Sequence, residues 1–385
     1  MERPYQICTR CIMDTTDAEI DFDADGVCSY CHTFEKNTYP IIARTKTKEG
    51  EETLRQIVRQ IKECGRNRSY DCLIGLSGGV DSSYLAYLVK TLGLRPLAVH
   101  FDSGWNSELA VNNIENIVKR LGIDLYTWVA DWEEMKDLQL AFFRASLANC
   151  DIPQDHAFLA AIYHVAAAKN IKYVLPGGNL ATESILPPSW GYNAGDARHV
   201  KAIQKRFGTR KLRKYPMFSV FQRYIYYPFI KGIRTVRLLN YVPYNKGEAI
   251  RVITKELDWR SYGNKHYESF FTRFFQSYYL PTKFGYDKRK AHYSSLIVSG
   301  QMTRDEAIKE MEKPLFTPQQ AKEDLEFVAK KLGVSVQEFE EILALPKTSA
   351  EDYPSLAWLF SLKNWSTAKL RGFRFTKAIL DKRHT

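Results

Sequence analysis

Apolar residues in the first half of the chain follow two different spacings. Short apolar runs predict β-strands at residues 70–76, 95–102, 124–130 and 173–176, of which the first reads as a buried strand. Apolar residues at helical spacing predict α-helices at residues 53–64, 84–89, 109–121, 132–149 and 155–169. Strands that alternate with helices of this length predict an α/β fold with a doubly wound parallel sheet.

The alternation stops beyond residue 187. Tyr, Phe, Lys and Arg dominate up to about residue 295, and residues 303–343 again have helical spacing. We therefore expect a mainly helical C-terminal part. Residues 33–50 are polar and are predicted to form a linker.

Composition places the protein among ordinary globular chains. Of its 385 residues, 45% are hydrophobic and 26% charged, which excludes a disordered, collagenous or coiled-coil protein. No apolar run reaches the ~18 residues of a transmembrane helix. The first residues contain no apolar segment of the kind found in signal peptides. We expect a cytoplasmic protein whose seven cysteines do not form a disulfide framework.

Positive charge is concentrated in one segment. The whole chain carries +11, but residues 201–300 contain 21 Lys and Arg against 5 Asp and Glu, a local charge of +16. Such a segment indicates an anionic partner, which could be a nucleic acid, a membrane surface or a phosphorylated small molecule. A solvated basic face is the alternative.

Four cysteines near the N-terminus form two CxxC pairs, and Asp25 and Gly26 between the pairs indicate a tight turn. Two such pairs match a zinc ribbon in which four thiolates surround one Zn²⁺. Because they leave no position for substrate, we predict a structural zinc that supplies the folding energy of this short segment. Four unrelated reduced cysteines are the alternative. The predicted ligands are Cys8, Cys11, Cys28 and Cys31.

Residues 77–83, with the sequence SGGVDSS, lie between a predicted strand and a predicted helix. A glycine turn there lets backbone N–H groups face an anion, and the helix N-terminus adds partial positive charge. The serines supply hydroxyl donors, and Asp81 could cap the helix or hold Mg²⁺. The loop is neither a Walker A loop nor a GxGxxG turn. A purely structural turn is the alternative.

SGGVDSS after an apolar strand resembles the pyrophosphatase loop of the PP-loop ATPases, the N-type ATP pyrophosphatases. The resemblance implies that the loop binds the pyrophosphate of ATP and that AMP is transferred to an oxygen of the substrate. It places the adenine at the end of the second strand. Gly177, Gly178 and Asn179 follow another strand at its carboxyl end, where ligands of such sheets gather. The predicted nucleotide-binding residues are Ser77, Gly78, Gly79, Asp81, Ser82, Ser83, His100, Phe101, Asp102, Gly177, Gly178 and Asn179.

A wider resemblance covers about residues 5–345. The four cysteines, the loop, PGGN at 176–179, YGNKHYE at 262–268, FGYDKR at 284–289 and SGQMTR at 299–304 follow in the order found in the N-acetyl sugar amidotransferases. That family belongs to surface-polysaccharide biosynthesis, including LPS O-antigen, and to flagellin-glycan biosynthesis. Asn264 stands where the family usually has glycine.

The resemblance implies an enzyme that converts an acetamido group of a nucleotide-activated sugar into an acetamidino group. Ammonia would come from a separate glutaminase resembling that of histidine biosynthesis, with a cyclase-like companion. The exposed aromatics between residues 215 and 244 could dock that partner or could form a core. The sequence leaves open which sugar is modified, and whether LPS or flagellin is the destination.

Catalytic roles are assigned to Asp81, Lys265 and His266. Lys265 and His266 form a compact group with Glu268, although a surface strand or helix end is the alternative. The roles of a second basic group remain open: Lys283, Lys288, Arg289 and His292.

Amide resonance makes an acetamide carbon a poor electrophile, so its oxygen must first become a leaving group. Adenylylation by ATP achieves this, with Mg²⁺ and basic side chains stabilising charge on the phosphates. Two other functions remain open. A PP-loop tRNA-thiolation enzyme would use the same loop and a basic surface, but Cys150 lacks a partner cysteine for sulfur transfer. A zinc-ribbon adaptor that merely binds nucleotide is the other. Because the cysteine pair that tRNA thiolation needs is missing, we expect no nucleic-acid partner.

The predicted parts of the chain are a zinc-ribbon element, a PP-loop ATP pyrophosphatase domain, a basic and aromatic-rich substrate or partner region, and a C-terminal extension. Their boundaries are residues 1–40, 50–195, 196–345 and 346–385.

Overall fold

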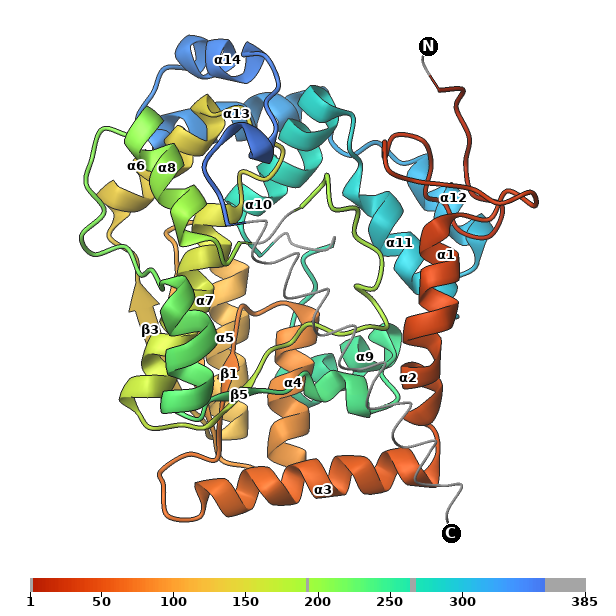
Figure 1. Ribbon diagram of the computed structural model, residues 1–385, viewed down its shortest axis with the longest axis vertical. Coiled ribbons are helices and arrows are strands. Elements are labelled where there is room, and N and C mark those ends of the chain that lie inside the picture. The colour runs from red at the N-terminus through yellow and green to blue at the C-terminus, as the bar shows by residue number, and fades with distance from the viewer. Residues whose placement is uncertain (1–2, 192–193, 264–267, 357–385) are drawn as a thin grey trace.

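A five-stranded parallel sheet forms the centre of the protein (Figure 1). The computed structural model describes residues 3–191, 194–263 and 268–356. The strand order is β3-β2-β1-β4-β5. The strands are β1 (Cys72–Gly75), β2 (Pro96–Asp102), β3 (Asp124–Val129), β4 (Tyr173–Leu175) and β5 (Arg234–Thr235).

Helices cover both faces of the sheet, which confirms the predicted doubly wound architecture. Successive residues of a strand point to opposite faces. Ile74 of β1 therefore packs in the core cluster of one layer and Leu73 in that of the other. The first layer contains α3 (Lys48–Gly65), α4 (Val80–Thr91), α5 (Glu108–Leu121) and α9 (Lys246–Leu257). The second contains α7 (Ile152–Ala168) and the π-helix η2 (Gln222–Ile230).

The C-terminal part is helical, as predicted, and packs through an aromatic-rich core. That core holds Phe143, Phe274 and Phe339, all fully buried. Besides one side of α7, the helices that contribute to it are α6 (Trp132–Arg144), α8 (Ala197–Phe207), α10 (Phe270–Phe274), η4 (Phe275–Phe284), α13 (Pro318–Leu332) and α14 (Val336–Ala344). The remaining elements of this region are η3 (Leu238–Tyr241), α11 (Lys288–Val298), α12 (Arg304–Met311) and η5 (Ala350–Asp352).

Three details of the sequence prediction were wrong. Residues 33–50 are helical and not a linker, because they contain η1 (Phe34–Thr38), α2 (Tyr39–Arg44) and the start of α3. Phe34 anchors this stretch because it packs in one buried cluster with the four N-terminal cysteines. Three of these cysteines precede α1 (Ser29–Thr33), and Cys31 lies within it. The helix predicted at 132–149 ends at Arg144, since Ser146 adopts a left-handed conformation. The two-residue strand β5 was missed because it is too short to give a pattern.

Within the described part of the chain, no helix is both long enough and apolar enough to cross a membrane.

Candidate functional site

The SGGVDSS loop joins β1 to α4 and turns at Gly78. Gly78 has φ +84°, and a Cβ there would lie 3.0 Å from Tyr262 Oη and 3.1 Å from Ala110 O. Trp259 Nε1 donates to the Gly78 carbonyl at 2.7 Å and Tyr262 Oη donates at 3.0 Å. The loop is therefore held from outside by residues 181 and 184 positions later in the chain.

The loop hydroxyls differ in their surroundings. Ser77 Oγ and Ser82 Oγ lie 3.1 Å apart, and Ser82 Oγ also donates to Gly79 O. Ser83 is fully buried and donates to Gly79 O at 2.7 Å. Gly79 is the N-cap of α4, so the free N–H groups and the positive end of this helix belong to the loop.

A cavity of about 400 Å³ lies against the loop; we call it the loop cavity. The predicted residues that line it are Ser77, Gly79, Asp81, Ser82, Gly177 and Gly178. Its other walls include Phe158, Ile162 and Tyr163 of α7, Arg223 of η2, and Glu183, Arg237, Lys246, Tyr262, Gly263 and Glu268. The cavity is large enough for a small ligand and has an anion-binding turn on one side.

Asp81 lies in the first turn of α4, where its carboxylate accepts hydrogen bonds from Tyr244 Oη and, at 3.2 Å, from Asn179 Nδ2. Burial and the neighbouring Asp81 raise the pKa of Tyr244, so the phenol remains a donor. Glu268 also faces the loop, because a Cβ at Gly79 would lie 3.2 Å from Glu268 Oε1. Two carboxylates beside an anion loop form a donor set of the kind that Mg²⁺ prefers.

Other predicted nucleotide-binding residues lie outside the lining of this cavity. His100 is buried, with Nδ1 2.9 Å from Leu76 O and Nε2 2.9 Å from Asn106 Nδ2, and burial lowers its pKa. Phe101 belongs to the core, and Asp102 accepts from Gly104 N. The structure therefore gathers the loop and the strand-end glycines but not the end of β2.

Two predicted catalytic residues, Lys265 and His266, lie outside the described residues. Gly263 and Glu268, which flank the undescribed segment, both line the loop cavity. Four lining side chains that come from distant segments were not predicted, namely Glu183, Arg223, Arg237 and Lys246, nor was the bond from Tyr244 to Asp81. A basic, aromatic-rich composition was their only signal, since nothing local in their sequence points to a ligand.

A second cavity, of about 690 Å³, adjoins the first and shares Lys246 and Gly263 with it. We call it the α11 cavity. The α11 residues that line it are Lys288, Arg289, His292, Tyr293 and Leu296. Arg273, Gln276, Gln301, Glu306 and Glu310 are among its other lining residues. The charged residues of its walls are five cations, Lys246, Arg273, Lys288, Arg289 and Lys313, and three carboxylates, Asp287, Glu306 and Glu310.

The structure separates the basic residues whose roles the sequence left open. Arg289 is engaged by Asp287, with Nη2 at 2.7 Å, and by Lys313 O. Lys283 donates to Leu343 O and lines neither cavity. Lys288 lies 5.3 Å from the centre of the Phe275 ring. With His292 one helical turn later, Lys288 presents positive or polar groups to the α11 cavity.

The four N-terminal cysteines are buried and their sulfurs lie within 4.8 Å of one another. Sγ of Cys11 lies 3.7 Å from Sγ of Cys28, and Sγ of Cys8 lies 3.9 Å from Sγ of Cys31. Four sulfurs at ~2.3 Å from one ion would be separated by about 3.8 Å, so the cluster has the dimensions of a tetrahedral zinc site. Backbone N–H groups, such as that of Cys28 at 3.3 Å from Cys8 Sγ, also favour thiolates.

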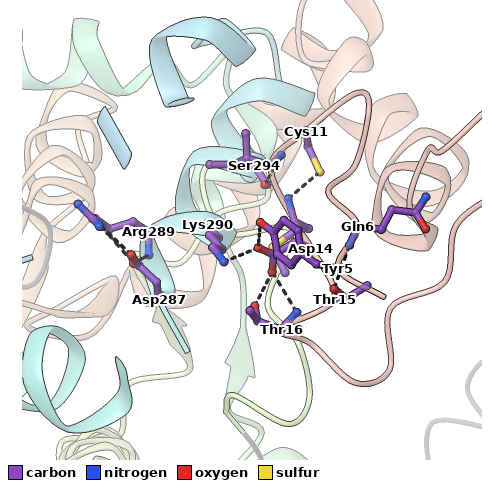
Figure 2. A network of polar contacts seen from close by, with 12 residues as sticks. Tyr5, Gln6, Cys11, Asp14, Thr15, Thr16, Asp287, Arg289, Lys290 and Ser294 are labelled. Atoms are coloured by element: carbon purple, nitrogen blue, oxygen red, sulfur yellow. Dashed lines mark hydrogen bonds and ion pairs between the residues drawn. The ribbon is translucent and has the colours of Figure 1, made fainter. Parts of the chain in front are cut away.

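The cysteine-bearing segment packs on the back of α11 (Figure 2). Lys290 pairs with the fully buried Asp14, and Ser294 Oγ accepts from Ile12 N at 3.2 Å. Although burial raises the pKa of Asp14, hydrogen bonds from Lys290 and Thr16 hold it below its ordinary value. The Arg304 guanidinium donates to the carbonyls of Cys8 and Cys11 at 3.1 Å. One side of α11 thus faces a cavity and the other carries the cysteine cluster.

Two protein families match parts of the chain. Residues 51–214 match NAD synthase. Residues 268–367 match the family described as LPS biosynthesis protein WbpG-like, C-terminal domain.

Individual relatives give shorter or more distant similarity. A stretch of 71 residues is 42% identical to the tRNA(Ile)-lysidine synthase of Chlamydia pneumoniae and spans 17% of this chain but only 22% of that protein. The NMN synthetase structure from Francisella tularensis is 14% identical, covers 78% of this chain and 99% of its own, and has a TM-score of 0.33. The structure of the NH3-dependent NAD synthetase of Campylobacter jejuni subsp. jejuni NCTC 11168 is 15% identical, covers 78% of this chain and 98% of its own, and has a TM-score of 0.32. Because both TM-scores are below 0.5, the assignment of an NAD synthase-type domain and a WbpG-like domain rests on the two family matches.

Proposed function

Because this chain joins an ATP pyrophosphatase domain of the NAD synthase type to a WbpG-like C-terminal domain of LPS biosynthesis, as its sequence predicted, we propose that it is an ATP-dependent amidotransferase. The substrate would be a nucleotide-activated sugar, in LPS O-antigen or flagellin-glycan biosynthesis. Its acetamido group becomes an acetamidino group. We place the reaction in the cytoplasm, where ATP is available.

The observation that carries this proposal is the pair of adjoining cavities. The loop cavity offers an anion-binding turn for ATP, and the α11 cavity offers a separate, larger and cation-rich space for an acceptor. Lys246 and Gly263 belong to both, so groups bound in the two cavities would meet there. A transfer of AMP from one ligand to the other needs this arrangement.

In the proposed reaction the acetamide oxygen attacks the α-phosphorus of ATP, a P–O bond forms, and pyrophosphate leaves toward the SGGVDSS loop. The resulting O-adenylyl imidate is then attacked at carbon by NH₃. The C–O bond breaks, AMP departs with the former amide oxygen, and the released protons pass to nearby bases. Lys265 and His266 are our candidates for proton transfer and charge stabilisation at the phosphates.

Two metal ions are part of the proposal. Mg²⁺ would be held by Asp81, with Glu268 nearby, and would neutralise charge on the phosphates. Zn²⁺ would be held by Cys8, Cys11, Cys28 and Cys31 in a structural role, because four thiolates leave no open position.

We propose that ammonia comes from a partner glutaminase resembling that of histidine biosynthesis, with a cyclase-like companion. Hydrolysis of glutamine needs an activated thiolate, whereas Cys150 is buried and burial raises its pKa to about 12. The sequence left the aromatics at 215–244 as either core or docking face, and both kinds occur. Tyr215 and Tyr244 are buried, while Phe221 at the start of η2 and Phe229 within it are 55% and 79% exposed and could contact the partner.

A tRNA-modifying enzyme is the alternative, and the similarity to tRNA(Ile)-lysidine synthase is the observation in its favour. Part of the basic segment is instead matched by carboxylates. Among the pairs are Arg210–Glu133, Lys214–Asp131, Arg273–Asp324, Arg289–Asp287 and Lys290–Asp14. This internal pairing reduces the charge available to a polyanion and supports the small-molecule function.

The test supplies the purified protein with ATP, Mg²⁺, ammonium chloride and a panel of nucleotide-activated N-acetyl sugars. We expect AMP, pyrophosphate and a sugar product whose mass corresponds to replacement of oxygen by NH. Rates should rise with pH because only neutral NH₃ has a free lone pair. Glutamine should not replace ammonium without the glutaminase. Formation of ADP, product from glutamine unaided, or submicromolar tRNA binding at physiological salt would contradict the proposal.

A further inference from the structure

Arg223 lies on η2 and, like the first turn of α4, lines the loop cavity. Its guanidinium carbon is 4.4 Å from the centre of the Tyr163 ring and 5.5 Å from that of Phe218. Tyr163 is itself fixed, because its hydroxyl lies 2.7 Å from Thr235 Oγ1. Two aromatic rings therefore hold the guanidinium in place without using its N–H groups.

The N–H groups of Arg223 lack the partners that other arginines of this protein have. Within the described residues, Nη1 of Arg223 is buried and has no hydrogen-bond partner, and Arg223 forms no ion pair. Arg95, Arg273 and Arg289, by contrast, each bind an aspartate in the same chain. Arg223 is half-buried as a residue, but its Nη1 is a buried charged donor without an acceptor, which is costly. A ligand bound in the cavity could supply that acceptor.

We propose that Arg223 binds an anionic phosphoryl oxygen of the nucleotide in the loop cavity; this inference rests on the proposed use of ATP. The loop and the N-terminus of α4 supply N–H donors on one wall, and Arg223 adds a charged donor from η2. A guanidinium matches phosphate oxygens because it offers planar, paired N–H groups. A nucleotide bound both by the N–H donors of the loop and by Arg223 would be fixed in position before the acceptor attacks.

The experiment measures binding of α,β-methylene-ATP, which cannot be cleaved at the α–β linkage, by titration calorimetry. Arg223→Met removes the charge but keeps an apolar side chain against Tyr163 and Phe218. The matched control is Arg234→Met. Arg234 also lies over a tyrosine ring, with its guanidinium carbon 5.9 Å from the centre of Tyr173, but it lines a different pocket. Thermal unfolding of each variant separates a folding defect from a binding defect.

We expect Arg223→Met to weaken binding of α,β-methylene-ATP about tenfold or more. A loss of this size is typical when a charge-assisted hydrogen bond is removed. Arg234→Met should bind like the wild type. Arg223→Lys, which keeps the charge but loses the planar fork, should fall between, and it serves as the test if the Met variant does not fold. Equal binding by Arg223→Met and wild type, equal losses in both Met variants, or no binding by the wild type would overturn the inference.

Failure of the inference and failure of the proposed function give different results. Wild-type turnover of ATP with a nucleotide-sugar, together with unchanged binding by Arg223→Met, rejects only the role of Arg223. Loss of nucleotide binding in Arg223→Met, without AMP formation by the wild type on any sugar of the panel, supports Arg223 and rejects the amidotransferase.

Discussion

The loop cavity and the α11 cavity are neighbours but are built in different ways. The anion-binding wall of the loop cavity comes from one continuous segment, β1, the SGGVDSS loop and α4, in which each residue has a local reason for its place. The α11 cavity has no such segment. Its walls come from α10, η4, α11 and α12 and from Lys246, and α11 is held from behind by the cysteine cluster. Under the proposed function, nucleotide binding thus depends on a local motif, whereas acceptor binding depends on long-range packing.

This difference gives the N-terminal segment a specific purpose. Asp14, Ile12 and the carbonyls of Cys8 and Cys11 contact α11 and α12 on the side away from the cavity. Damage to the cysteine cluster should therefore affect the acceptor more than the nucleotide. Damage to the loop should do the reverse.

The largest effect is expected for Cys8→Ser, which removes one thiolate from the cluster. Metal binding supplies folding free energy on the order of 10 kcal/mol in small zinc sites, so the segment should lose zinc and order. The zinc content measured by metal analysis should fall below one zinc per chain. KM for the acceptor should rise more than KM for ATP. Cys64→Ser, a half-buried cysteine of α3, is the control. Wild-type protein without zinc would refute the site.

Asp81→Ala should have the next largest effect, now on the loop cavity. Loss of the carboxylate removes the acceptor of the Tyr244 and Asn179 hydrogen bonds and the proposed Mg²⁺ ligand. We expect pyrophosphate release to slow about a thousandfold or more, as for other charge-stabilising groups, while the fold and the zinc content persist. Asp305→Ala removes the first-turn aspartate of α12 and is the control. A variant at position 81 with the wild-type rate would argue against any role in catalysis.

Lys290→Met tests the contact between the cysteine-bearing segment and α11. Asp14, with 0% exposure, would remain as a buried charge without its cation, which costs about 3 kcal/mol of unfolding free energy. Lys119→Met breaks the exposed Lys119–Glu115 pair and should cost less than ~1 kcal/mol. Denaturant unfolding measures both. If the two variants lose equal stability, the buried pair does not hold α11.

How far the sequence could predict these regions follows the same division. The loop, the strand-end glycines and the four cysteines were recognisable because turn, strand and ligand spacing are local properties. Trp259 and Arg223 were not, since their roles arise only when α9 and η2 pack against the sheet. His100, which the resemblance to the PP-loop ATPases places near the nucleotide, lies within β2, and both of its ring nitrogens lie 2.9 Å from protein atoms, Leu76 O and Asn106 Nδ2.

The smallest expected effect concerns pH and a buried histidine of α7, the helix that also supplies one wall of the loop cavity. His156 of α7 stacks on Phe218 at 4.7 Å, has Nδ1 2.7 Å from Ala194 O, and has a pKa lowered by burial from 6.5 to about 4. The unfolded chain therefore binds a proton between pH 6.5 and 4 that the folded protein does not. Stability from the neutral imidazole is complete above pH 6.5 and is lost on acidification through that window, by ~1.4 kcal/mol per pH unit. The variant His156→Asn can keep the bond to Ala194 O but does not titrate. When the pH is lowered from 7.5 to 5.5, its free energy of unfolding, measured with denaturant, should fall by about 1.4 kcal/mol less than that of the wild type. Parallel pH profiles for the two proteins would show that the folded protein protonates His156 as readily as the unfolded chain does, and that burial does not exclude a charge there.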